Sequence, residues 1–115
     1  MIECSTGDVV LLPFPFTDFS TFKQRPALVI SSPKWNARRP DIIIAAISSR
    51  MHGSEFEYIL NEKEERTGGL RVPSAVRLGN IYTIDKCLVR EVLGSLDKKN
   101  VQSIQAKIHQ VISVA

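Results

Sequence analysis

The sequence contains few of the side chains that bind metal ions. It has two cysteines, Cys4 and Cys87, and two histidines, His52 and His109, in 115 residues. Two widely separated cysteines cannot build a disulfide framework or a Cys₄ zinc site. The four residues also show no metal-ligand spacing. We therefore expect a protein with no bound metal and no cofactor.

Long hydrophobic runs are missing as well. The longest uncharged apolar run, Ile42 to Ile47, is far shorter than the roughly 18 residues that a membrane-spanning helix needs. Glu3 and Asp8 lie where a signal peptide would carry a basic region followed by an apolar one. These absences predict no membrane association and a cytoplasmic location. The length fits one domain over residues 1–115.

The chain is mildly basic, and its charge is unevenly distributed. Lys and Arg number 15 against 12 Asp and Glu, which gives a net charge of +3. Residues 1–60 hold six charges of each sign, whereas residues 61–115 hold nine basic and six acidic side chains. This balance is compatible with a polyanion as partner. For such a partner, the natural contributors in the second half are Arg66, Arg71, Arg77 and Lys86.

Short apolar runs bounded by turn residues predict about six or seven strands. The runs cover residues 9–12, 27–31, 42–47, 56–60, 72–78, 81–84 and 89–93. Those at 27–31 and 42–47 are expected in the centre of the sheet, with Pro33 to Pro40 as the loop between them. A further loop of about nine residues, Phe16 to Gln24, is long enough to be functional.

Only the end of the chain has the period of a helix. Val101, Ile104 and Ile108 begin a series of apolar residues at steps of three and four, which is typical of one face of an amphipathic helix. Asp97 is the expected N-cap. The whole pattern predicts a mostly β protein, a small barrel with a C-terminal helix packed on it.

Four motifs resemble, in their order and spacing, those of one known family. They are Gly7-Asp8-Val9-Val10, Arg25-Pro26-Ala27-Leu28-Val29-Ile30, Ala45-Ala46-Ile47-Ser48-Ser49 and Thr83-Ile84-Asp85-Lys86. The chain resembles the MazF/PemK family of toxin ribonucleases from about Gly7 to the C-terminal helix. The segment from Pro13 to Asp18 resembles a widespread branch of that family.

The resemblance implies an SH3-like barrel that forms a homodimer and binds single-stranded RNA in a groove. It implies an endoribonuclease that needs no metal and cuts at short specific sequences. The ribose 2′-hydroxyl would attack the adjacent phosphate and leave a 2′,3′-cyclic phosphate and a 5′-hydroxyl end. It also implies a toxin-antitoxin pair that controls growth, in which a cognate antitoxin protein blocks the groove with an acidic, partly disordered segment.

The family's essential arginine falls on Arg25, and its hydroxyl partner, commonly threonine, falls on Ser48. The chemistry supports these two catalytic residues independently, because a guanidinium matches the charge that gathers on phosphate oxygens during transesterification. The Ser48 hydroxyl keeps the hydrogen-bond donor of threonine. A guanidinium holds its proton too tightly to be a ready base, which favours charge stabilisation over base catalysis for Arg25. The general base stays open, with Asp18 and Asp85 as the nearest carboxylates.

Lys23, Gln24 and Arg50 flank this pair, where they either contact phosphates or are simply solvated. Aromatic side chains in two loops could stack on unpaired bases or pack beneath the loops; they are Phe16, Phe19, Phe22 and Trp35. The predicted RNA-binding residues are Phe16, Thr17, Ser20, Lys23, Gln24, Ser49, Arg50, Asn80, Asp85 and Lys86.

The sequence departs from the family's motifs at two places. Tyr82 stands where relatives more often carry arginine, which leaves a phosphate contact there undecided. The segment Phe19 to Gln24 differs from the Gly-Ser-Glu-Gln loop of many relatives, so the cut site of those relatives does not apply to this chain.

Two other functions stay open. One alternative is a gyrase poison, although such relatives use a tryptophan near the C-terminus and the only tryptophan here is Trp35. The other is a nucleic-acid-binding module, for RNA or DNA, without catalysis.

Overall fold

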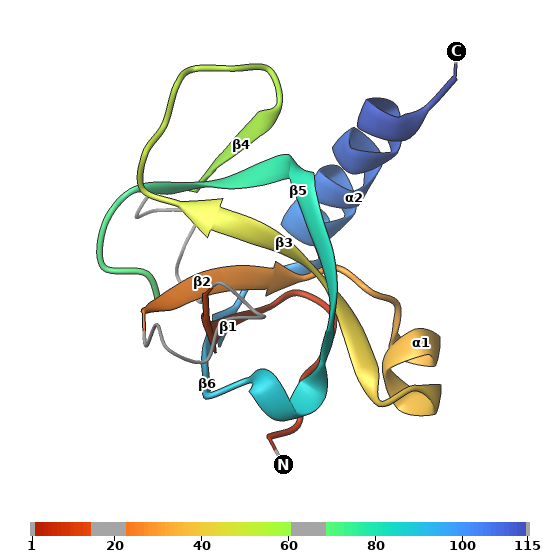
Figure 1. The fold of residues 1–115 in the computed structure, drawn as a ribbon. Coiled ribbons are helices and arrows are strands. Elements are labelled where there is room, and N and C mark those ends of the chain that lie inside the picture. Colours follow the sequence, from red (N-terminus) through yellow and green to blue (C-terminus); the bar gives the residue numbers. More distant parts are fainter. Residues whose placement is uncertain (1, 15–22, 61–68, 115) are drawn as a thin grey trace.

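A six-stranded antiparallel sheet curls around the centre of the molecule and forms most of it (Figure 1). The computed structural model describes residues 2–14, 23–60 and 69–114. The strands follow the order β4-β5-β3-β2-β1-β6 across the sheet. They are β1 (Asp8–Pro13), β2 (Gln24–Val29), β3 (Asp41–Ser48), β4 (Glu57–Leu60), β5 (Ser74–Asp85) and β6 (Glu91–Ser95). The prediction of a mostly β protein with β2 and β3 at its centre is confirmed.

The predicted C-terminal helix is confirmed as α2 (Lys98–Ile112), which packs against the sheet. The Asp97 carboxylate accepts a hydrogen bond from the Asn100 N–H at 2.8 Å and so caps the helix as expected. Val101 and Ile104 are buried in the core. The first turn has no acidic residue to favour the helix dipole, so packing of this apolar face holds the helix in place.

The loop predicted between the two central strands is wrong in part, because Pro33–Arg38 form a short helix, α1. The Ser32 hydroxyl accepts a hydrogen bond from the Trp35 N–H at 3.1 Å. Pro33 occupies the first position of the helix, where its missing N–H costs nothing. Ser-Pro is therefore a helix start here. No helix in the described ranges is long and apolar enough to cross a membrane.

The prediction of two strands over 72–78 and 81–84 is also wrong, because the structure has one strand, β5. The chain does not turn around Gly79. Instead the register of β5 against β3 shifts, so that Ala45 pairs with Ile81 while Ile47 pairs with Val76. Such a bulge adds residues to one strand without ending it.

The last strand begins later than predicted. Lys86–Leu88 form a 3₁₀ helix, η1, between β5 and β6. The Asp85 carboxylate caps this helix by accepting from the Cys87 N–H at 2.9 Å. As a result β6 starts at Glu91 rather than at Val89.

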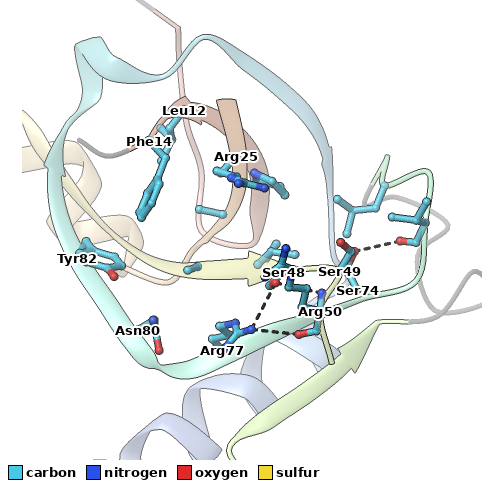
Figure 2. Close-up of a pocket in the computed structure, with 16 residues that line it drawn as sticks. Leu12, Phe14, Arg25, Ser48, Ser49, Arg50, Ser74, Arg77, Asn80 and Tyr82 are labelled. Carbon is cyan, nitrogen blue, oxygen red and sulfur yellow. Dashed lines mark hydrogen bonds between the residues drawn. The ribbon is translucent and has the colours of Figure 1, made fainter. Parts of the chain in front are cut away.

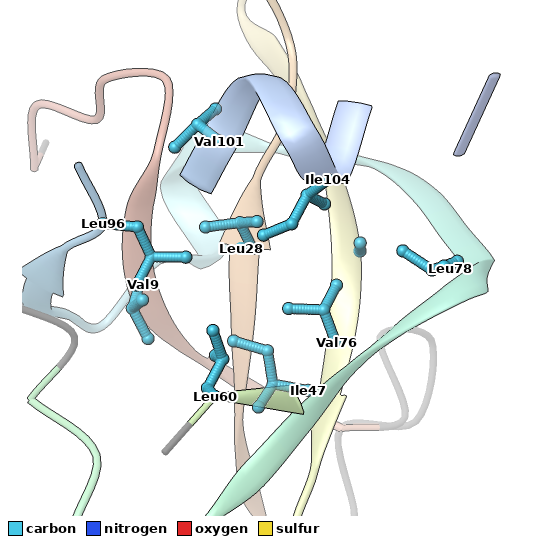
Figure 3. Packing of buried hydrophobic residues seen from close by; sticks show 10 residues of the cluster. Val9, Leu28, Ile47, Leu60, Val76, Leu78, Leu96, Val101 and Ile104 are labelled. Atoms are coloured by element: carbon cyan, nitrogen blue, oxygen red, sulfur yellow. The ribbon is translucent and has the colours of Figure 1, made fainter. Parts of the chain in front are cut away.

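Two hydrophobic clusters occupy the two faces of the sheet, because alternate residues of one strand point to opposite faces. Val9 and Leu28 belong to the cluster beneath α2, together with Val101 and Ile104 of the helix (Figure 3). Their neighbours in the strands belong to the second cluster, which includes Val10, Leu12, Ala27, Val29, Ile42, Ile44 and Ile84.

The central strands β2 and β3 separate near one end of the sheet. They pair from Val29 to Ala27 on β2, and the last pair joins Ala27 to Ala46. Beyond it, β2 continues to pair with β1, and β3 continues to pair with β5. Pro26 lies at the point of separation and has no N–H to donate to a neighbouring strand. The two strands therefore leave an opening between them.

Gly7 joins the start of β1 to both the sheet and α2. Its N–H donates to the Val29 carbonyl at 2.8 Å, and its carbonyl accepts from the Leu96 N–H at 2.9 Å. Its φ is +91°, and a Cβ built on it would lie 2.8 Å from Cγ2 of Val101. Glycine is thus needed for both the backbone conformation and the close approach of the helix.

We expect Gly7→Ala to lower the free energy of unfolding by about 1–3 kcal/mol, because it adds backbone strain and pushes α2 away. Urea denaturation measures this loss. Gly53→Ala is the matched control, since Gly53 also has a positive φ of +71° but no atom within 4 Å of an added Cβ. Equal losses in the two variants would contradict a role for the contact with Val101.

Candidate functional site

The opening between β2 and β3 is a pocket of about 460 Å³ (Figure 2). Residues of β1, β2, β3 and β5 line it. Three arginines are among them, Arg25, Arg50 and Arg77, and within the described part of the chain no Asp or Glu lines it. Serine, asparagine and tyrosine side chains add further hydrogen-bonding groups. The pocket is therefore a concave, positively charged surface, suited to an anion.

Arg25 and Ser48 come from the two strands that separate. Continuing the β2–β3 register two residues past the pair Ala27 and Ala46 places Arg25 opposite Ser48. In each strand these residues lie on the face of the second hydrophobic cluster, since Ala27 and Ile44 point the same way. Both side chains line the pocket (Figure 2). The structure thus brings the two predicted catalytic residues to one site.

Ser48 ends β3 with its hydroxyl group held in place. Its Oγ accepts a hydrogen bond from the Arg50 N–H at 3.1 Å. Nη2 of Arg77 lies 3.5 Å from the same Oγ, which is a long and weak contact. No acceptor for the Ser48 hydroxyl hydrogen lies among the described residues, so this hydrogen can be donated to a bound oxygen.

The other predicted site residues divide into four groups, of which Asp85 and Lys86 are the last. Ser49, Arg50 and Asn80 line the pocket. Lys23 and Gln24 lie next to it at the start of β2, where the Lys23 carbonyl accepts from the N–H of Phe14. The predicted residues that fall outside the described ranges are Phe16, Thr17, Asp18, Ser20, Phe19 and Phe22.

Asp85 and Lys86 do not line the pocket, although both are predicted RNA contacts. They lie at the far end of β5, where Asp85 pairs with Asp41. The Lys86 ammonium donates to the backbone carbonyl of Asn36. The Cys87 N–H donates to the Asp85 carboxylate and lowers its pKa. These two side chains therefore stabilise the turn around η1, and neither is among the described residues that line the pocket.

The aromatic residues near the site also differ from expectation. Trp35 lies in α1 rather than in a loop. The Arg39 guanidinium stacks over its ring, with Cζ of Arg39 4.5 Å from the ring centre. Arg39 in turn forms an ion pair with Asp41 at 2.8 Å. Phe14 and Tyr82 are the aromatic side chains that line the pocket in the described part of the chain.

Arg77 is the site residue that sequence reasoning missed. The charge distribution predicts it as a general contributor to polyanion binding but does not place it beside Ser48. Arg77 and Tyr82 are five residues apart, so in a regular strand they would point to opposite faces. The register shift in β5 lies between them and turns both side chains toward the pocket. The irregularity that Gly79 marks in the sequence was the available signal.

Glu57 is the cross-strand partner of Arg77, because the two residues pair across β4 and β5. Its carboxylate accepts instead from the backbone N–H groups of Ser54, at 2.9 Å, and His52, at 3.0 Å. These hydrogen bonds, that of Ser54 first, hold the pKa of Glu57 below its ordinary value of 4.5. Glu57 thus fixes the turn between β3 and β4 and forms no ion pair with Arg77.

Clusters of metal-binding side chains do not occur in the described ranges, where no three His, Cys, Asp or Glu residues lie close enough to hold an ion. The two cysteines are free thiols: Cys4 is buried and Cys87 is exposed. His52 and His109 are both exposed.

The sequence and the fold are both similar to those of known toxins. Residues 5–112 match the family described as PemK-like, MazF-like toxin of type II toxin-antitoxin systems. No protein of curated function matches the sequence.

Solved structures share the fold at low sequence identity. MazE-MazF from Deinococcus radiodurans aligns with a TM-score of 0.77 at 21% identity and covers 100% of both chains. An endoribonuclease in complex with its cognate antitoxin from a mycobacterial species aligns with a TM-score of 0.77 at 15% identity over 97% of each chain. Toxin MazF-mt6 of Mycobacterium tuberculosis aligns with a TM-score of 0.72 at 19% identity over 90% of this chain and 93% of its own.

The lowered pKa of Glu57 predicts an acid-sensitive turn beside the site. The Glu57 carboxylate binds a proton more weakly in the folded protein than in the unfolded chain. The free energy of unfolding should therefore fall as the pH drops from the ordinary value of 4.5 through the lower folded pKa. Glu57→Gln should remove this component from the pH dependence measured by urea denaturation.

Glu55→Gln is the control, because it removes a neighbouring carboxylate for which the described residues provide no hydrogen-bond partner. A pH dependence that is the same in the Glu57→Gln variant and the unaltered protein would contradict the assignment.

Proposed function

The chain belongs to the PemK-like, MazF-like family of type II toxin-antitoxin toxins, and on this premise we propose that it is an endoribonuclease toxin that cuts single-stranded RNA without a metal ion. The observation that carries the proposal is the pocket in which Arg25 and Ser48 come together from separating strands. The endoribonuclease named among the structures of the same fold supports it.

The proposed reaction is an internal transesterification. The ribose 2′-oxygen attacks the adjacent phosphorus, a new P–O2′ bond forms, and the P–O5′ bond breaks. The proton of the 2′-hydroxyl leaves to a base, and the O5′ leaving group takes up a proton. The products are a 2′,3′-cyclic phosphate and a 5′-hydroxyl end.

Arg25 and Ser48 would act on the phosphate during this step. Negative charge grows on the non-bridging oxygens as phosphorus becomes five-coordinate, and a guanidinium offers a planar fork of donors to them. The Ser48 hydroxyl would donate a further hydrogen bond, because the Arg50 N–H already occupies its acceptor side. Since the described residues place no carboxylate in the pocket, we assign these two residues to charge stabilisation and leave the base unassigned.

Ser49, Arg50 and Asn80 would extend the RNA contacts from this centre, because they line the same pocket. Lys23 and Gln24 would contact the strand at the start of β2. We also propose a homodimer and a cognate antitoxin. The positive pocket favours an acidic antitoxin segment for electrostatic reasons, and two structures of the same fold contain a MazE or an antitoxin partner by name.

The purified protein should cut mixed-sequence single-stranded RNA in the presence of excess chelator. Gel analysis should show fragments with 5′-hydroxyl ends, which polynucleotide kinase labels without prior phosphatase treatment. The 3′ ends should carry a cyclic phosphate. Cleavage only after a divalent cation is added would contradict the proposal, and so would 5′-phosphate ends.

Arg25→Ala should lower the cleavage rate by about 10³-fold or more, because it removes the main charge opposite the reacting phosphate. Arg25→Lys should recover only part of the rate, since an ammonium keeps the charge and loses the planar fork. Ser48→Ala should cost about 10²–10³-fold, while Ser48→Thr should stay close to the unaltered protein because the donor is kept.

Arg38→Ala is the matched control for Arg25→Ala, because Arg38 is an exposed arginine at the end of α1 and does not line the pocket. Circular dichroism should show that all variants fold. A folded Arg25→Ala protein that keeps near-full activity would move the site elsewhere.

A further inference from the structure

We propose that Arg77 binds the same RNA phosphate as Arg25 and Ser48 and forms the third side of a phosphate clamp. This inference rests on the proposed function. Arg25 would approach the phosphate from β2, Ser48 from β3 and Arg77 from β5. The ligand is a phosphodiester of single-stranded RNA.

The position of the Arg77 guanidinium supports this assignment. Its Nη2 lies 3.5 Å from the Ser48 Oγ and donates to the Arg50 carbonyl at 3.1 Å. Any phosphate oxygen that accepts from the Ser48 hydroxyl would therefore lie close to Arg77. Figure 2 shows the two side chains on the same side of the pocket, with dashed lines from Arg77 to Ser48 and to Arg50.

Arg77 has donors to spare for a ligand. A guanidinium carries five N–H donors. The contacts of Arg77 with the Arg50 carbonyl, the Ser48 Oγ and Nε2 of His52 all involve Nη2, so the N–H groups on Nε and Nη1 have no partner among the described residues.

The cross-strand partner of Arg77, Glu57, is hydrogen-bonded to the turn and forms no ion pair with Arg77, whose charge is the last of the causes that lower the pKa of Glu57. The ion pair in the described part of the chain is the one between Arg39 and Asp41. Arg77 therefore has no carboxylate at ion-pair distance there.

Arg77 is also better fixed than the other two arginines of the pocket. It is half-buried in the middle of β5, whereas Arg25 and Arg50 are exposed. Its hydrogen bond to the Arg50 carbonyl holds the guanidinium beside Ser48 before any ligand arrives. A charge that is already oriented needs little reorganisation during the reaction, and partial burial weakens its screening by water.

Two arginines in the clamp match the negative charge that the phosphate gathers in the transition state. The five-coordinate phosphorus carries more negative charge than the diester, and two guanidinium groups of the same pocket, those of Arg25 and Arg77, can share it. Tyr82 brings no charge to the same wall of the pocket, so Arg77 supplies the cation of β5.

Two measurements on Arg77→Gln test the clamp. The first is binding of a mixed-sequence, fully 2′-O-methylated single-stranded RNA, which cannot be cut, at several salt concentrations. Loss of one phosphate contact should reduce the slope of log K against log salt by about 0.7. The second is cleavage of unmodified RNA, where we expect kcat/KM to fall on the order of 10²-fold.

Arg38→Gln removes the same charge far from the pocket and should leave the slope and kcat/KM near those of the unaltered protein. Arg77→Lys should restore the salt slope, because the charge returns, but only part of the rate. This difference separates a phosphate contact from a purely structural role, which lysine would restore or fail to restore in both measurements together.

Each outcome decides a separate question. If the intact protein cuts RNA and Arg77→Gln matches Arg38→Gln in slope and rate, the clamp is wrong and the proposed function stands. If the intact protein binds RNA without cutting it, the proposed function fails, and the salt slope of Arg77→Gln still shows whether Arg77 contacts a phosphate. If the intact protein does not bind RNA at all, both proposals fail.

Discussion

The separation of β2 from β3 at Pro26 is the constraint on which the site depends. The two strands pair through Ala27 and Ala46 and then follow different neighbours, β1 on one side and β5 on the other. Proline has no backbone N–H group, so the break between β2 and β3 leaves no unpaired N–H at Pro26. The residues that would have been the next partners, among them Arg25 and Ser48, instead face an open pocket. The position of Pro26 thus links the strand pairing of the sheet to the pocket.

Charge in the molecule is arranged so that the pocket stays positive. Asp41 is paired with Arg39, Asp85 caps η1, and Glu57 binds the backbone of the turn between β3 and β4. Each of these carboxylates has a pKa lowered by its partner, which shows that each is stabilised as an anion where it lies. None of them lines the pocket, so in the described part of the chain its arginines keep their charge for a ligand.

Periodicity and turn residues were sufficient to predict the mostly β fold, the central strands and the cap of α2 at Asp97. The family motifs predicted Arg25 and Ser48, which the structure brings to one pocket. Local reasoning failed where an effect depended on neighbouring strands. The register shift that turns Arg77 inward exists only because β5 pairs with β3. Asp85 and Lys86 fall outside the pocket lining because β5 continues past Tyr82 to Asp85. The start of α1 is a local signal, because the Ser32 hydroxyl caps the helix and Pro33 fits its first position.

A crystal structure of the protein with a 2′-O-methylated single-stranded RNA tests the central claim most directly. We expect a backbone phosphate in the opening between β2 and β3, with its oxygens within hydrogen-bond distance of the Arg25 guanidinium and the Ser48 hydroxyl. RNA bound on another face of the molecule, with no phosphate between these two side chains, would contradict the claim.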